Sequence, residues 1–158
     1  MKKPVLVIIA LIYILAIAVV GFLGIPARIF NPKTFVEDIQ LTFDDKLTPM
    51  ELNEIDKTDP EKRVDYKFKI RTSTAVSFYV SAKPLPNEAT DKLLSFERID
   101  RASFCTMSEP ELKGDYTTAT FTCAALPAKT VKNIYFKVRP TDGNYNLVKY
   151  VKIIVQNI

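Results

Sequence analysis

Two cysteines are the residues of this chain with the clearest capacity for chemistry. Cys105 and Cys123 lie in separate segments of alternating residues, and a bond between them would close a loop of about 18 residues, worth roughly 3 kcal/mol in the loop-entropy model. The Cys-x-x-Cys spacing of redox motifs is absent. A metal site would need two more soft ligands, and the chain contains no histidine. The pair therefore predicts a disulfide and an oxidising compartment, with buried free thiols as the alternative.

The remaining inventory argues against an enzyme. The absence of histidine removes the commonest general acid or base. There is no Gly-x-Ser-x-Gly, no Ser-x-x-Lys and no glycine-rich phosphate loop. Nothing in the sequence selects one pair of carboxylates for glycoside hydrolysis. We therefore expect no catalytic residue, no metal site and no cofactor.

Acidic residues gather in the segment 37–61, where only Lys46 and Lys57 oppose them. Clustered oxygen ligands suit Ca²⁺, but the spacing of an EF-hand loop is absent. We interpret the segment as a solvated acidic surface, with a calcium site as the alternative. The opposite bias appears near the C-terminal end, where only Asp142 opposes six basic residues: Lys129, Lys132, Lys137, Arg139, Lys149 and Lys152. We interpret them as the outward faces of two expected strands, with head-to-tail docking or an anionic envelope polymer as the alternative.

The net charge of +4 does not indicate a nucleic-acid partner. Four basic residues flank an uncharged N-terminal segment, and without them the chain has 18 basic and 18 acidic residues. These four are Lys2, Lys3, Arg28 and Lys33. The basic excess is typical of the flanks of a membrane span, and the rest of the chain leaves no basic footprint for nucleic acid.

Residues 4–27 contain no charged side chain and are apolar on all sides. About 20 apolar residues suffice for a helix to cross a hydrocarbon core of roughly 30 Å. We therefore predict a transmembrane signal-anchor helix over 5–25, ending before Pro26. A cleaved signal peptide is the alternative, because Ala-Ile-Ala at 16–18 fits a cleavage site. The sequence stays apolar beyond that point, which favours the anchor.

The anchor divides the chain into four parts. Residues 1–4 form the expected cytoplasmic N-terminus and 5–25 the transmembrane helix. Residues 26–34 form a juxtamembrane linker, and 35–158 form one extracytoplasmic domain.

Alternation of apolar and polar residues predicts that this domain is all-β. The clearest segment, 64–71, has the pattern of a half-buried antiparallel strand. A weaker strand is expected over 96–105. Its apolar residues Ile99 and Phe104 would point to opposite faces of a regular strand, and a β-bulge between them would bring both to one face. Further strands are expected at 36–43, 75–82, 116–124, 131–139 and 146–156. About seven short strands without long helices between them favour an antiparallel β-sandwich.

Two local motifs connect these strands. Thr48, Pro49 and Glu51 form a capping-box pattern with proline at the first helical position, which predicts a short helix over 49–56. Asp142 and Gly143 lie between the last two expected strands. Asp-Gly at such a position predicts a hairpin turn, because glycine readily adopts the positive φ that the turn requires.

The segment 133–146, NIYFKVRPTDGNYN, resembles the last hairpin of immunoglobulin-like or cadherin-like domains on bacterial surfaces. The resemblance covers the last part of the chain and implies an immunoglobulin-like β-sandwich. A true immunoglobulin core has a tryptophan between its cysteines, and this chain has no tryptophan. No functional residue is therefore carried over from the resemblance.

Together these features predict a single-pass membrane protein whose outer domain is a binding or structural module. An accessory subunit of a membrane or envelope complex fits best, with the lipid bilayer and either another envelope protein or a second copy as partners. A pilus-like filament subunit is one alternative, although the glycine and glutamate that usually flank the apolar run of such subunits are missing. An exported ligand-binding protein or enzyme is another, and it would need a deep pocket.

Overall fold

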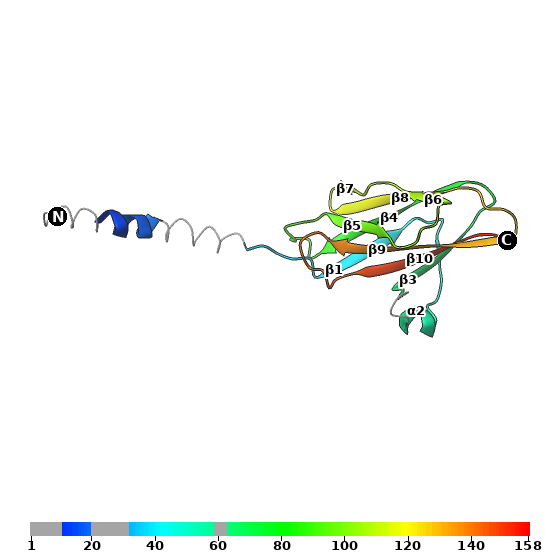
Figure 1. Ribbon diagram of the computed structural model, residues 1–158, viewed down its shortest axis with the longest axis horizontal. Helices are drawn as coiled ribbons and strands as arrows, with labels where there is room; N and C mark the ends of the chain where they lie inside the picture. Colours follow the sequence, from blue (N-terminus) through cyan, green and yellow to red (C-terminus); the bar gives the residue numbers. More distant parts are fainter. Residues whose placement is uncertain (1–10, 20–31, 59–62) are drawn as a thin grey trace. The chain divides into compact units, whose positions relative to one another are not determined.

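The structure is a computed structural model that describes residues 11–19, 32–58 and 63–158 (Figure 1). The chain divides into two compact units, Met1–Lys33 and Thr34–Ile158. Each unit is described by itself.

In the first unit, residues 11–19 are helical. Among the residues that the structure describes, no helix has both the length and the apolar character needed to cross a membrane. Much of the predicted transmembrane helix over 5–25 lies outside the described residues. The same holds for three of the four flanking basic residues, Lys2, Lys3 and Arg28.

The described residues of the second unit form β-strands and one short helix, in agreement with the alternation in the sequence. Its elements are β1 (Asp38–Phe43), β2 (Thr48–Pro49), α2 (Glu54–Thr58), β3 (Tyr66–Arg71), β4 (Val76–Leu85), β5 (Leu94–Arg98), β6 (Cys105–Met107), β7 (Glu111–Lys113), β8 (Tyr116–Cys123), β9 (Thr130–Pro140) and β10 (Lys149–Asn157). One sheet has the order β1-β4-β8-β6, with β7 also paired to β8. The other has the order β2-β3-β10-β9-β5 (Figure 1).

The two sheets share one hydrophobic core. Along β8, alternate residues are buried, and Phe121 is among those with no exposed surface. Its ring stacks on Phe78 of the same sheet at a centroid distance of 5.3 Å and meets Phe136 of the other sheet at 4.8 Å. The period of two along each strand therefore directs one face of each sheet into a common apolar interior.

The pairing of β3 differs from the prediction of an antiparallel strand. It pairs in parallel with β10, where Phe68 lies opposite Ile153, and antiparallel with the short β2. Alternation reports which side chains face the core, but it does not report the direction of the neighbouring strand. The polar face of β3 is also less exposed than expected, because Lys67 makes a 2.7 Å ion pair with Asp56 of α2.

The expected strand over 96–105 is two strands in different sheets. β5 belongs to the sheet of β9, and β6 belongs to the sheet of β8. The change of parity between Ile99 and Phe104 therefore marks a crossing between the sheets and corrects the predicted bulge. Arg98 holds the crossing, because its guanidinium donates to Asp100 and to the carbonyl oxygens of Ala102 and Cys105.

The helix does not begin where the capping pattern placed it, which corrects the prediction for Thr48, Pro49 and Glu51. Thr48–Pro49 is the edge strand β2. Pro49 has no N–H to donate, and an edge strand tolerates this because no further strand pairs on its outer side. Glu51 precedes α2 without belonging to it. Asn53 caps α2: its Oδ1 accepts from the Asp56 N–H at 2.8 Å, while its own N–H donates to Asp56 Oδ2 at 3.2 Å. This reciprocal pair has the pattern of a capping box, formed with shorter polar side chains.

Candidate functional site

The structure places Cys105 and Cys123 directly opposite each other on β6 and β8. Both are free and buried, and the Cys123 thiol donates to Cys105 Sγ across 2.6 Å. This hydrogen bond lowers the pKa of Cys105 and raises the pKa of Cys123, because the donated proton stabilises a thiolate at 105 and is retained at 123. Cys105 is therefore the more nucleophilic position of the pair.

An arginine lies beside the two thiols. The Arg98 guanidinium donates to the Cys105 carbonyl and forms an ion pair with Asp100. Its positive charge further lowers the pKa of Cys105. Arg98 Nε is buried and has no hydrogen-bond partner among the described residues. Sequence reasoning missed this arginine, although Arg98 shares the inward parity of Leu94 and Phe96 along β5, where a charged residue is unexpected.

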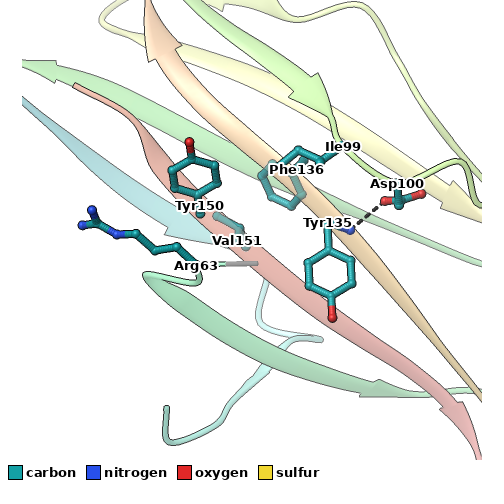
Figure 2. Close-up of a pocket in the computed structure, with 7 residues that line it drawn as sticks. All are labelled: Arg63, Ile99, Asp100, Tyr135, Phe136, Tyr150 and Val151. Atoms are coloured by element: carbon teal, nitrogen blue, oxygen red, sulfur yellow. Dashed lines mark hydrogen bonds between the residues drawn. The ribbon is translucent and has the colours of Figure 1, made fainter. Parts of the chain in front are cut away.

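A pocket of about 220 Å³ lies near Asp100 (Figure 2). Its lining combines tyrosine and aliphatic side chains from the strands with two charged residues: Arg63, Ile99, Asp100, Tyr135, Phe136, Tyr150 and Val151. In Figure 2 the rings of Tyr135 and Tyr150 project from the neighbouring strands β9 and β10.

The two charged side chains of this pocket, Asp100 and Arg63, are already engaged. Asp100 Oδ2 accepts from the Tyr135 N–H at 2.6 Å, and its Oδ1 accepts from the Ala102 N–H at 2.8 Å. Arg63 is paired with Asp65 at 3.2 Å. The volume is below the roughly 300–1,000 Å³ typical of small-molecule sites. One engaged carboxylate does not form a catalytic pair, so the pocket fits a single apolar side chain better than a substrate.

The acidic segment does not converge on a cation site. Asp44 accepts from the backbone of Lys46 in the turn after β1, and Asp56 is buried against Lys67 and Lys152. No group of three His, Cys, Asp or Glu residues able to hold a metal occurs in the described ranges. Asp59 and Glu61 lie outside the described residues.

The basic residues near the C-terminal end are largely compensated. Lys137, Lys149 and Lys152 form ion pairs at 3.1, 2.7 and 3.6 Å with Glu97, Asp38 and Asp56, respectively. The hydrogen bond from Lys149 lowers the pKa of Asp38 and raises that of the lysine. Together with the 3.6 Å pair between Arg139 and Glu97, these ion pairs place a carboxylate beside four of the six basic side chains.

Asp142 and Gly143 lie in the loop that joins β9 to β10, where Gly143 has a φ of 101°. Asp142 is buried, and its carboxylate makes two hydrogen bonds to backbone N–H groups that the sequence did not predict. Its Oδ2 accepts from the Val36 N–H at 2.7 Å, and its Oδ1 accepts from the Asn144 N–H at 2.9 Å. The turn therefore fixes the segment through which the chain enters the domain.

Comparison of the chain with protein-family models, with curated proteins and with solved structures found no match. A proposal for the function of this chain therefore rests on its residues and their geometry.

Proposed function

We propose that this chain is a single-pass, membrane-anchored module without enzymatic activity, whose extracytoplasmic domain has an immunoglobulin-like fold. It serves as an accessory subunit of a membrane or envelope complex. One observation carries the proposal: the uncharged apolar run of residues 4–27 is joined to a separate compact all-β unit, Thr34–Ile158. A run of this length favours membrane insertion over a place in a soluble core.

The strand order supports the immunoglobulin-like fold. Constant-type immunoglobulin domains carry strands A, B, E and D in one sheet and C, F and G in the other. Numbered along this chain, β1-β4-β8-β6 corresponds to A-B-E-D, and β5-β9-β10 corresponds to C-F-G. β3 is an additional strand that follows β1 and pairs in parallel with β10. The cysteine pair departs from antibody domains, because it joins neighbouring strands of one sheet.

The cysteines support an extracytoplasmic position for the domain. Cys105 and Cys123 face each other in register and are shielded from solvent. In an oxidising compartment, the Cys105 thiolate would attack the disulfide of a thiol–disulfide oxidase. Cys123 would then displace the reduced oxidase from the mixed disulfide. The chain gives up two electrons and two protons, and the oxidase becomes a dithiol.

A binding or bracing role agrees with the pocket geometry. The small pocket, whose two charged side chains are engaged, suits one side chain of a partner, because interfaces often bury an anchor side chain in a recess. Against an enzyme, Asp100 is bound by three donors, including Arg98.

The decisive experiment is fractionation of native membranes followed by lysine cross-linking and mass spectrometry. We expect the full chain in the membrane fraction with one dominant stoichiometric partner. Cross-links solely between copies would favour a filament, and a soluble chain lacking about its first 18 residues would overturn the anchor in favour of a cleaved signal.

A matched pair of variants sharpens this experiment. Ile14→Arg with Ile17→Arg places two charges in the apolar run, each costing about 2.5–3.5 kcal/mol at the centre of a membrane helix. This variant should leave the membrane fraction. Ile55→Arg with Val131→Arg adds the same charges at side chains that are 72% and 48% exposed, and it should stay. Equal behaviour of the two variants would contradict the anchor.

A further inference from the structure

Two tyrosines flank the pocket of about 220 Å³ that Figure 2 shows, and we call this pocket the tyrosine recess. Tyr135 of β9 is the cross-strand partner of Lys152, so Tyr150 of β10 is its diagonal neighbour on the same face of the sheet. Phe136 and Val151 also line the recess and pair with each other across the two strands. Their side chains are buried in the core, so their backbone forms the floor of the recess between the two tyrosines.

Each of the two tyrosines is held at its backbone by a neighbouring aspartate. The Tyr135 N–H donates to Asp100 Oδ2 at 2.6 Å, and the Tyr135 carbonyl accepts from the Ile99 N–H at 2.9 Å. The Tyr150 N–H donates to Asp65 Oδ2 at 2.8 Å, and the Tyr150 carbonyl accepts from the Asp65 N–H, also at 2.8 Å. The two aspartates lie just outside the ends of β5 and β3. They continue the strand pairing there, and so they fix the position of both tyrosines.

The polar groups left free in the tyrosine recess can all donate a hydrogen bond. The Asp100 carboxylate already accepts from three donors. Neither tyrosine hydroxyl is hydrogen-bonded within the part of the chain that the structure describes, and Figure 2 shows the two hydroxyls directed away from each other. Arg63 keeps guanidinium N–H groups beyond those bound to Asp65, and a guanidinium can only donate. The recess therefore offers a ligand several free donors but no free carboxylate.

We propose that the tyrosine recess binds a proline-rich, extended segment of a partner protein. An ordinary peptide residue buried there would bring a backbone N–H that needs an acceptor. Proline brings an apolar ring and a carbonyl but no N–H. Extended proline segments make no internal hydrogen bonds, so their carbonyls are free to accept from tyrosine hydroxyls, and such segments commonly dock in aromatic-lined grooves. This inference rests on the binding role proposed above and gives the partner a chemistry.

A glycan fits the same groups less well. Each buried sugar hydroxyl brings a proton that needs an acceptor, and the carboxylate of the recess is occupied. Exposed aromatic side chains elsewhere lack the arrangement of the recess. Tyr79, for example, is 44% exposed in the other sheet, but its cross-strand partner is Thr120, which offers no ring. The combination of two tyrosines, a hollow between them and free donors therefore selects this place among the described residues.

The test measures the fluorescence anisotropy of fluorescein-labelled decaproline titrated with the full chain in detergent micelles. An equally long glycine–serine peptide with two central leucines is the control ligand, because it carries apolar side chains together with backbone N–H groups. Maltohexaose is added as a competitor. Tyr135→Ala and Tyr150→Ala remove the rings, whereas Tyr135→Phe and Tyr150→Phe remove only the hydroxyls. Tyr79→Ala is the matched control, and circular dichroism verifies the fold of every variant.

We expect saturable binding of decaproline that either alanine substitution in the recess weakens at least about tenfold. Either phenylalanine substitution should weaken it by about two- to tenfold, the usual effect of one lost hydrogen bond, and Tyr79→Ala should leave it unchanged. No binding of decaproline to the unmodified chain, or equal affinities in all variants, would overturn the proposal. Equal binding of the leucine peptide would replace proline by any apolar side chain, and displacement by maltohexaose would assign the recess to a glycan.

The failure of this inference is distinguishable from the failure of the proposed function. A dominant partner that cross-links in native membranes to the unmodified chain and to Tyr150→Ala alike, without decaproline binding, would keep the accessory subunit and overturn the recess. Binding of decaproline by a chain that has no stoichiometric partner in native membranes would keep the recess and overturn the accessory subunit.

Discussion

Replacement of Asp142 by alanine tests whether the β9–β10 loop holds the entering chain. Asp142 is 7% exposed, and its carboxylate accepts from the backbone N–H groups of Val36 and Asn144. Hydrogen bonds to a charged group contribute about 1.5–3 kcal/mol each. Water can reach the part-buried Asn144, whereas Val36 has no exposed surface. We therefore expect Asp142→Ala to lower the free energy of unfolding by about 2–4 kcal/mol, mostly through the stranded N–H of Val36.

The assay is urea unfolding of the full chain in detergent, followed by tyrosine fluorescence and by far-ultraviolet circular dichroism. With a urea slope of about 2 kcal/mol/M, the midpoint should fall by roughly 1–2 M. Asp142→Asn keeps one acceptor oxygen and should fall between the alanine variant and the unmodified chain.

Asp45→Ala is the matched control, because Asp45 is an exposed aspartate in the turn after β1. Its effect should stay within about 0.5 kcal/mol. An Asp142→Ala midpoint equal to that of Asp45→Ala would refute the argument that Asp142 holds the backbone of Val36.

Three further predictions concern the core, the buried ion pair and the thiols. Oxidation of Cys105 and Cys123 should lower the mass by about 2 Da and stabilise the domain by roughly 3 kcal/mol, and treatment with dithiothreitol should abolish both effects; an oxidised chain with an unchanged urea midpoint would contradict the loop-entropy reasoning. Phe121→Ala should cost about 3–5 kcal/mol in urea unfolding, because the ring is fully buried where the two sheets meet. Burial raises the pKa of Asp56, but the hydrogen bonds from Lys67 and from the Asn53 N–H, together with the charges of Lys152 and Lys67, outweigh it, so the net pKa is lowered. The ionised Asp56 therefore stabilises the fold above about pH 4 and loses this effect as the pH falls through its folded pKa. Asp56→Ala should cost about 3 kcal/mol at pH 7 and progressively less as the pH falls below about 4, and a cost that does not change with pH would exclude the charge as the cause.

Patterns along one segment predicted much of the fold. The alternation of β8 identified the buried face that carries Phe121 and Cys123. The segment 131–139 lies within β9, and 75–82 lies within β4 except for its first residue. The loop at Asp142 and Gly143 was also readable, because a residue with positive φ has a strong chemical preference. In each case the signal lies within a few neighbouring residues.

The candidate site was predictable only in part. The sequence singled out Cys105 and Cys123 by type, but their register as direct neighbours depends on the pairing of β6 with β8. The two tyrosines of the pocket gave no local signal, and the role of Arg98, a charged residue at the inward parity of β5, was not recognised. Their roles arise where strands distant in sequence meet, and no short motif encodes that meeting.

The sequence by itself determined the all-β character of the domain, the apolar run before it and the residue types available for chemistry. Those properties depend on composition and on a period of two, both of which are local. Only the tertiary structure decided the parallel pairing of β3 with β10, the crossing at Arg98 and the burial of Asp56 against Lys67. A side-chain period specifies which face is buried but leaves the partner strand and its direction open. Those are selected by the packing and hydrogen bonding of the whole chain.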